Sequence, residues 1–197
     1  MISGIILVGC LVLVACGGGQ GQEATPTGEA GPPTPTAEAE PPEPLPTVDP
    51  NVSLVEYHSP DKGYSISYPL GWQVDIQPDF ADYFLWSTES GRPLAQLAVT
   101  CNEGALTPDD LMRVDSAVAA RMGGIDPASV VPVEIAGTTG KQLRYTVQTG
   151  PLSVEQVAAY APGEKCGWRL GLASYGSGTL LPYLPLFQRI IDSFQPD

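Results

Sequence analysis

The sequence predicts an α+β domain, in which antiparallel strands pack against helices, preceded by an apolar leader and a linker. Three observations predict it. Short segments of alternating apolar residues, separated by turn residues, fill residues 54–101 and 130–174. Two other segments, near residues 107–122 and 184–194, carry apolar residues at helical spacing instead. The 21 prolines and 22 glycines are concentrated before residue 53 and in turns, so one core follows a linker.

Residues 1–15 form an apolar leader. Its run from residue 2 to residue 14 has the length of a signal-peptide core and is too short to span a bilayer. It ends in LVACG at residues 13–17, which resembles the lipobox of bacterial lipoproteins. The resemblance implies cleavage before Cys16, acylation of that cysteine with chains such as palmitate, and attachment to the cell membrane on its extracytoplasmic face.

Two alternatives remain open at this leader. Cys10 ends a second lipobox-like stretch, although little apolar chain precedes it for export. The apolar run could also be kept as a short membrane anchor, but the small Ala15 at the cleavage position argues against this. Residues 1–4 lack the basic side chain of a typical leader. In a cell with two membranes, Gly17 is not the aspartate associated with inner-membrane retention, so the choice of membrane is open.

Residues 16–52 predict a disordered linker that carries the lipidated cysteine. They are rich in Pro, Thr, Ala and Glu and nearly lack large apolar side chains, so they cannot bury enough surface to offset the entropy of ordering. Proline bias and acidic repulsion extend the linker to at most about 100 Å, at roughly 3 Å per residue. A proline-rich docking ligand and an O-glycosylated stalk are the alternatives to a plain spacer. The domain then occupies residues 53–197.

The chain is acidic, with 22 Asp and Glu against nine Lys and Arg and a net charge of -13. The part after the linker keeps 16 acids and all nine bases and is acidic in its own right. Because phosphate binding needs clustered positive charge, we expect no nucleic-acid partner.

The first half of the domain predicts strands. Residues 54–68 form a hairpin around a turn at residues 59–63, which contains proline and glycine. Trp72 follows a break after the second strand. Residues 83–86 are apolar at successive positions, which predicts a strand covered on both faces, and residues 94–101 continue as a further strand.

A helix is predicted to begin at Thr107, which can cap it, and Pro108 suits its first turn. Asp109 and Asp110 favour the positive end of the helix dipole, and the glycines at 123–124 end the helix. Its apolar side chains recur at helical spacing and predict the face that packs on the sheet: Leu111, Val114, Val118 and Met122.

The second half of the domain predicts four strands, near residues 130–136, 142–148, 152–160 and 166–174, with turns between them. Pro182 and Pro185 limit where a final helix can begin. That helix carries one apolar stripe against the sheet: Leu184, Phe187, Ile191 and Phe194.

Two segments, GYSISYPLGW at residues 63–72 and PLFQRIIDSF at residues 185–194, resemble the signatures of PsbP-like domains. These domains include the photosystem protein PsbP, the Mog-type Ran-binding proteins and bacterial lipoproteins of the LpqN type. The resemblance covers about residues 54–197 and matches the order of elements above. It implies an antiparallel sheet between helices, an α/β/α sandwich, that binds other proteins. It implies no catalytic residue, cofactor or metal site.

Cysteine usage adds one link. Cys10 leaves with the leader and Cys16 is acylated, which leaves Cys101 and Cys166 as a pair outside the cytoplasm. We expect a disulfide between them. Two separate buried thiols remain the alternative, because the pairing of strands cannot be fixed from the sequence.

Other motifs have plain structural interpretations. His58, the single histidine, stands beside a turn and is expected in solvent. Ser59 and Lys62 fit the Ser-x-x-Lys pattern of penicillin-binding serine enzymes, but the companion motifs are missing. Residues 137–142 resemble a phosphate loop with glycines too close together and predict a hairpin turn. Three aspartates fit no calcium loop and predict a solvated acidic edge: Asp75, Asp79 and Asp82.

Four aromatic side chains are expected mainly in the core, with some of them as candidates to line a groove: Trp72, Phe80, Phe84 and Trp86. Taken together, the sequence predicts a lipid-anchored extracytoplasmic module that binds an envelope protein or assists one, without catalysis of its own. A carrier of small hydrophobic ligands or lipids is the first alternative, and a serine hydrolase is the second.

Overall fold

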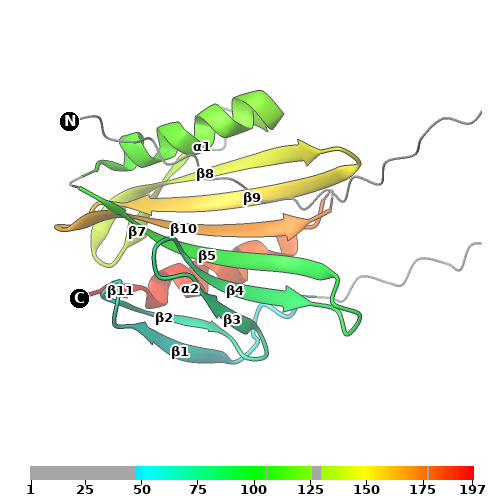
Figure 1. Cartoon of the computed structure of the whole chain (residues 1–197), viewed down its shortest axis with the longest axis horizontal. Helices are drawn as coiled ribbons and strands as arrows, with labels where there is room; N and C mark the ends of the chain where they lie inside the picture. The colour runs from blue at the N-terminus through cyan, green and yellow to red at the C-terminus, as the bar shows by residue number, and fades with distance from the viewer. Residues whose placement is uncertain (1–47, 105, 126–129, 177) are drawn as a thin grey trace, which may run out of the picture. The chain divides into compact units, whose positions relative to one another are not determined.

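The computed structural model describes residues 48–104, 106–125, 130–176 and 178–197 (Figure 1). Within these ranges, no helix is long and apolar enough to cross a membrane. The predicted signal peptide with Cys10, the predicted lipidation site Cys16 and most of the predicted linker lie outside the described residues.

The described chain contains two α-helices, a short 3-10 helix and strands in two sheets. The elements of the first half are β1 (Leu54–Ser59), β2 (Tyr64–Pro69), β3 (Gln73–Ile76), β4 (Asp82–Ser87), β5 (Pro93–Glu103), α1 (Pro108–Met122) and β6 (Gly123–Ile125). Those of the second half are β7 (Val131–Ile135), β8 (Thr138–Thr149), β9 (Leu152–Ala161), β10 (Cys166–Tyr175), η2 (Leu181–Tyr183), α2 (Leu184–Ser193) and β11 (Gln195–Pro196).

The larger sheet has eight strands in the order β3-β4-β5-β10-β9-β8-β6, with β7 paired to β8, and the smaller sheet has the order β1-β2-β11. The pairings are antiparallel in both sheets. Helix α1 lies along β8 and β9, and α2 runs behind β5 and β10 in Figure 1. The predicted α/β/α sandwich is confirmed. The small sheet and α2 pack on the same face of the large sheet.

Strand β9 shows how two layers bury the centre of the large sheet. Successive strand side chains point to opposite faces. Val157 and Ala159 belong to the larger core, which contains α2 and the small sheet, while Ala158 and Tyr160 belong to the smaller core under α1. All four are fully buried, because both faces of this strand are covered, and so the strand does not alternate between polar and apolar side chains.

Helix α2 buries a wider stripe than the spacing predicted. Leu186 and Ile190 are buried beside the predicted Phe187, Ile191 and Phe194, while the predicted Leu184 is only partly buried. The helix therefore has the broad apolar face typical of one that packs on a sheet.

Helix α1 begins as predicted, but it packs by a different face. The Thr107 hydroxyl accepts from the Asp110 backbone N–H at 3.2 Å, and the Asp110 carboxylate accepts from the Thr107 backbone N–H at 3.2 Å, which is a reciprocal cap. Of the four residues predicted to face the sheet, only Leu111 is buried; Val114, Val118 and Met122 are 59%, 41% and 43% exposed. The predicted face is therefore wrong beyond Leu111. The row that packs is Leu111, Asp115 and Ala119.

The packed region extends upstream of the predicted boundary at residue 53. Val48 and Val52 pack against the larger core, and the Arg189 guanidinium on α2 donates to the carbonyl oxygens of Pro50 and Val52. Strands β3, β6 and β11 were not predicted from the sequence; they are only four, three and two residues long.

Candidate functional site

Ser59 and Lys62, which the sequence places in a turn, converge on Asp82 at the start of β4. The carboxylate of Asp82 is fully buried and accepts from the Ser59 hydroxyl at 2.8 Å and from the Tyr64 hydroxyl at 2.7 Å. Lys62 Nζ lies 2.7 Å from the other carboxylate oxygen, and its side chain is only 7% exposed. The expectation of a solvated acidic edge is wrong for Asp82, because the β1–β2 hairpin folds over it.

The polar contacts of this Asp82 cluster hold the β1–β2 hairpin against the start of β4. Burial opposes ionisation of Asp82, but hydrogen bonds from Lys62, Tyr64 and Ser59 outweigh it, so the pKa of Asp82 is lowered. Burial, together with the Asp82 carboxylate, raises the pKa of Tyr64. Ser59 directs its proton to a carboxylate, and Lys62 donates to that carboxylate and to the Gln77 carbonyl at 3.2 Å. Both side chains are thus directed at the Asp82 carboxylate.

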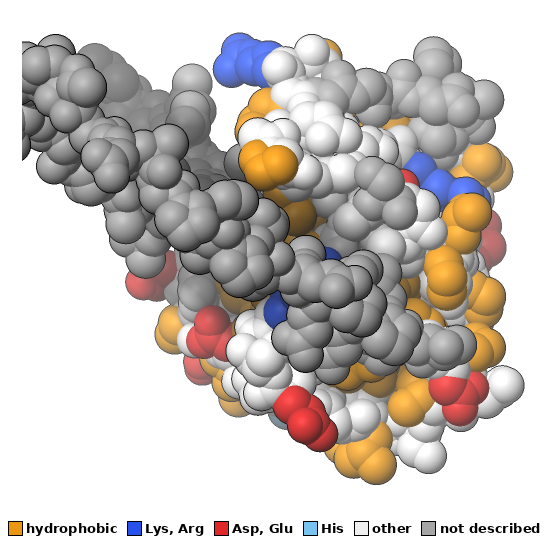
Figure 2. All heavy atoms as spheres, turned by 90° about the vertical axis from the view of Figure 1, so that its right-hand side faces the viewer, with side chains coloured by type: hydrophobic (Ala, Val, Ile, Leu, Met, Phe, Trp, Pro, Cys, Tyr) orange, Lys and Arg blue, Asp and Glu red, His pale blue; other side chains and the backbone are white. Residues whose placement is uncertain are grey.

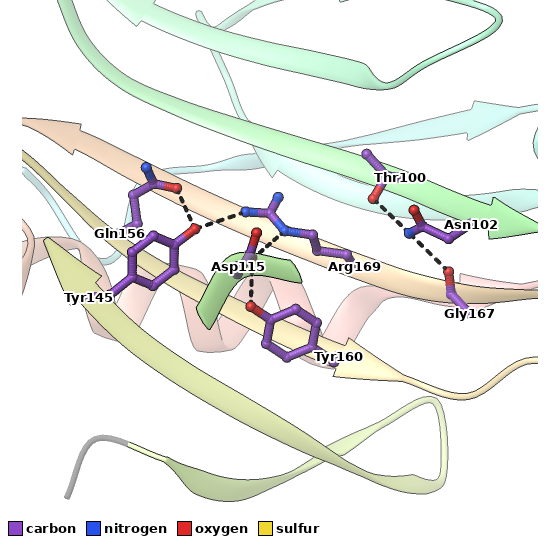
Figure 3. A network of polar contacts seen from close by, with 8 residues as sticks. All are labelled: Thr100, Asn102, Asp115, Tyr145, Gln156, Tyr160, Gly167 and Arg169. Atoms are coloured by element: carbon purple, nitrogen blue, oxygen red, sulfur yellow. Dashed lines mark hydrogen bonds and ion pairs between the residues drawn. The ribbon is translucent and has the colours of Figure 1, made fainter. Parts of the chain in front are cut away.

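A second polar network lies between α1 and the large sheet (Figure 3). Asp115 of α1 accepts from the Tyr160 hydroxyl at 2.5 Å and from Arg169 Nε at 2.7 Å. Arg169 also donates to the Tyr145 hydroxyl at 3.3 Å, and that hydroxyl donates to Gln156 at 2.9 Å. The network thus joins the helix to three neighbouring strands, β8, β9 and β10.

The sheet is shaped to hold the guanidinium of Arg169. A Cβ atom at Gly171 would clash with that guanidinium, so the glycine leaves the space that the arginine fills. Burial opposes the charge of Arg169, but the Asp115 carboxylate outweighs it and the pKa of Arg169 is raised. Burial raises the pKa of Tyr145 to about 12.

Replacement of Asp115 by alanine is expected to lower the free energy of unfolding by about 3 kcal/mol, because it leaves a largely buried guanidinium without its partner. Urea denaturation at neutral pH measures this. Asp109→Ala is the matched control on the same helix, since its bond to Lys141 is exposed and such pairs contribute about 1 kcal/mol or less. Equal effects from the two variants would show that the network does not hold α1.

The predicted disulfide forms between β5 and β10. Trp168 is the residue opposite Cys101 in the strand register, so Cys166 stands diagonally across from it. The two Cα atoms are 5.5 Å apart. The prediction of a Cys101–Cys166 bond is confirmed.

Three of the four predicted groove aromatics lie together in the larger core. Trp72 and Phe84 are buried, and the Trp86 ring stacks on Trp72 with centroids 6.4 Å apart. The rings of Trp86 and Tyr183 form a T-shaped pair with centroids 6.0 Å apart. Phe80 stands apart from them, in the connection before β4, next to Tyr83. A groove lined by these residues stays a prediction.

The remaining motifs behave as ordinary turns and surface. His58 is exposed. Residues 136–137 form the turn between β7 and β8, where Gly137 has a φ of 74°. A hairpin is therefore present, but its turn is shorter than the predicted residues 137–142, because Thr138 to Gln142 belong to β8 and pair with β7. Within the described ranges, no group of three or more His, Cys, Asp or Glu side chains could hold a metal ion.

Comparison with known proteins shows likeness of fold. No family model matches the chain, and no curated protein matches it. A crystal structure of a protein from Bacteroides thetaiotaomicron matches with a TM-score of 0.52 and 10% identity, over 72% of this chain and 48% of the other. This chain therefore spans about half the length of that protein.

Two further solved structures are similar. The solution structure of cyanobacterial PsbP (CyanoP) from Synechocystis matches with a TM-score of 0.50 and 17% identity, over 79% of this chain and 100% of the other. LpqN of Mycobacterium tuberculosis, involved in cell envelope biogenesis, gives a TM-score of 0.47 and 14% identity, over 74% and 92%. The likeness to the cyanobacterial protein establishes a PsbP-like fold for the domain.

Proposed function

We propose that this PsbP-like domain serves as a lipid-anchored, extracytoplasmic binding or accessory module without catalysis of its own. The observation that carries the proposal is the Cys101–Cys166 disulfide. Disulfides persist in extracytoplasmic compartments and are rare in the cytosol, so this bond favours export of the domain. Export is also what the lipobox-like residues 13–17 predict.

The buried polar chemistry supports binding over catalysis. Among the described residues, every buried side-chain nitrogen or oxygen has a hydrogen-bond partner. The most chemically capable groups, Ser59, Lys62 and Arg169, are committed to Asp82 and Asp115. A catalytic site needs an activated group that faces a substrate, whereas these groups hold the hairpin and α1 in place.

The PsbP-like fold adds a second line of support. The characterised PsbP-like proteins that the two sequence signatures resemble act by binding other proteins. The lipid at Cys16 would hold the domain at the membrane, and residues 17–47 would let it reach an envelope protein nearby. The proposed partner is therefore a protein of the cell envelope.

Lipidation is tested by replacing each of the two leader cysteines in turn. Cys16→Ser is expected to abolish incorporation of an alkyne-tagged palmitate and to leave the leader uncleaved, because the acylated thiol is missing. Cys10→Ser is the matched control and should keep both label and cleavage. Gel migration and fluorescence of the tagged chain measure the two effects in the native host. Label that survives in Cys16→Ser and disappears in Cys10→Ser would place the anchor on Cys10 instead. The absence of label from both variants would contradict a lipid anchor at Cys16.

A further inference from the structure

The outer surface of α1 is the most unusual face of the domain. Val114, Val118 and Met122 lie four residues apart and form one exposed apolar row along the helix. The row flanks the buried row of Leu111, Asp115 and Ala119, because residues three apart on a helix are neighbours, and the polar Asp115 shows that the helix is not apolar all round. The contacts of Asp115 with Arg169 and Tyr160 fix which side of α1 faces outward.

The exposed side of α1 lacks the acidic character of the chain as a whole. Beyond its first turn, the exposed residues of α1 are apolar or basic, with no acid among them: Arg113, Val114, Ala117, Val118, Ala120, Arg121 and Met122. The acids of the first turn are paired, Asp109 with Lys141 and Asp110 with Arg113. A chain with a net charge of -13 thus presents an apolar face bordered by two arginines. In Figure 2, basic and hydrophobic side chains adjoin at the top of the molecule, the level at which Figure 1 shows α1.

A second copy of the chain fits this face poorly. Two α1 helices packed through their apolar rows would bring Arg113 and Arg121 of each copy near the arginines of the other. Arg113 is already paired with Asp110 in the first turn, and beyond that turn the outer face offers no acid for Arg121. An anionic lipid surface offers an apolar acyl boundary for the two valines and Met122, and it offers phosphates for the arginines.

We propose that the outer face of α1 docks on an anionic membrane surface, with Val114, Val118 and Met122 at the acyl boundary and Arg113 and Arg121 on lipid phosphates. The inference rests on the proposed lipid anchor at Cys16. The chain between Cys16 and the first described residue, Val48, has an upper reach of roughly 90 Å, so the anchor leaves the domain free to turn α1 toward the membrane. Tethering makes the docking effectively intramolecular, and a small apolar row then suffices.

The distant acids do not prevent this docking. Charges separated by more than about 8 Å are largely screened at physiological ionic strength. The three acids of α1 are each ion-paired, Asp109 with Lys141, Asp110 with Arg113 and Asp115 with Arg169, so none of them adds an unpaired negative charge to this side of the helix.

The test uses the lipidated, mature protein with Val118→Cys carrying an environment-sensitive thiol dye. The new cysteine is the single free thiol, because Cys16 would be acylated and Cys101 and Cys166 are bonded. Val74→Cys is the matched control, since Val74 on β3 is 37% exposed against 41% for Val118. Both proteins are placed on vesicles of phosphatidylglycerol with phosphatidylcholine and on vesicles of phosphatidylcholine alone.

The dye at residue 118 is expected to shift to the blue on vesicles that contain phosphatidylglycerol, and the dye at residue 74 to stay unchanged. Arg113→Gln and Arg121→Gln should each reduce the docked population about fivefold, as should raised salt. A protein that floats with the vesicles but shows the same emission at both positions would overturn the docking and leave the anchor intact. A protein that does not float would overturn the anchor, and the docking with it. A shift that appears without vesicles and grows with protein concentration would assign the face to a protein contact instead.

Discussion

Replacement of Asp82 by alanine is expected to lower the free energy of unfolding by about 4 kcal/mol, the largest effect of a single substitution that we predict. It leaves the ammonium of Lys62 buried without its partner, which costs about 3 to 5 kcal/mol. It also leaves the buried hydroxyls of Ser59 and Tyr64 without their acceptor. Urea denaturation at neutral pH measures the loss.

Asp79→Ala is the matched control for Asp82→Ala. Asp79 is an exposed aspartate three positions earlier, and its replacement should change stability by about 0.5 kcal/mol or less. Lys62→Met combined with Asp82→Leu removes both charges and should recover much of the loss. A loss of 1 kcal/mol or less in Asp82→Ala would contradict the role assigned to the cluster.

The Asp82 cluster also has a pH signature. Because the pKa of Asp82 is lower in the folded chain than in the unfolded one, its contribution is fully present above its unfolded pKa of about 3.9 and is lost as pH falls through its folded pKa. The stability of the wild-type chain should therefore drop more steeply in this acidic range than that of Asp82→Asn.

Removal of the disulfide by Cys101→Ser with Cys166→Ser is expected to lower the free energy of unfolding by about 4 kcal/mol. The bond closes a loop with a sequence separation of 65, and the loss of loop entropy in the unfolded chain sets the magnitude. Thermal unfolding followed by circular dichroism measures the change.

The disulfide prediction carries an internal control. A reductant should destabilise the wild-type chain to about the level of the double variant and leave the double variant unchanged. A double variant that unfolds at the wild-type temperature, or a wild-type chain that ignores the reductant, would show that the bond does not form in solution.

The elements with strong local signals were predictable from the sequence. The β1–β2 hairpin, β5, the four long segments after residue 130 and both helices carry their own periodicity and turn residues. Strand β3 was not predictable, because its four residues are all exposed and its pairing depends on β4. The capping residues Thr107 and Pro108 predicted the start of α1. The 3.6-residue period did not predict its inner face, because the row that packs includes the polar Asp115 and is not recognised as an apolar row.

The two polar networks depend on contacts between distant residues. Lys62 and Asp82 are 20 residues apart, and Asp115 and Arg169 are 54 apart. The sequence held one weak signal of the second network: Arg169 stands inside an otherwise apolar strand, where a charge requires a partner. Nothing local identifies that partner as Asp115 among the chain's 22 acids.

The measurement that tests the central claim most directly is native mass spectrometry of the full-length protein, extracted from its own membrane in mild detergent. The proposed function predicts a chain that begins at Cys16, carries the mass of its acyl groups and lacks two hydrogens for the Cys101–Cys166 bond. It also predicts that an envelope protein accompanies the chain. An unmodified chain that still carries residues 1–15 would contradict the account.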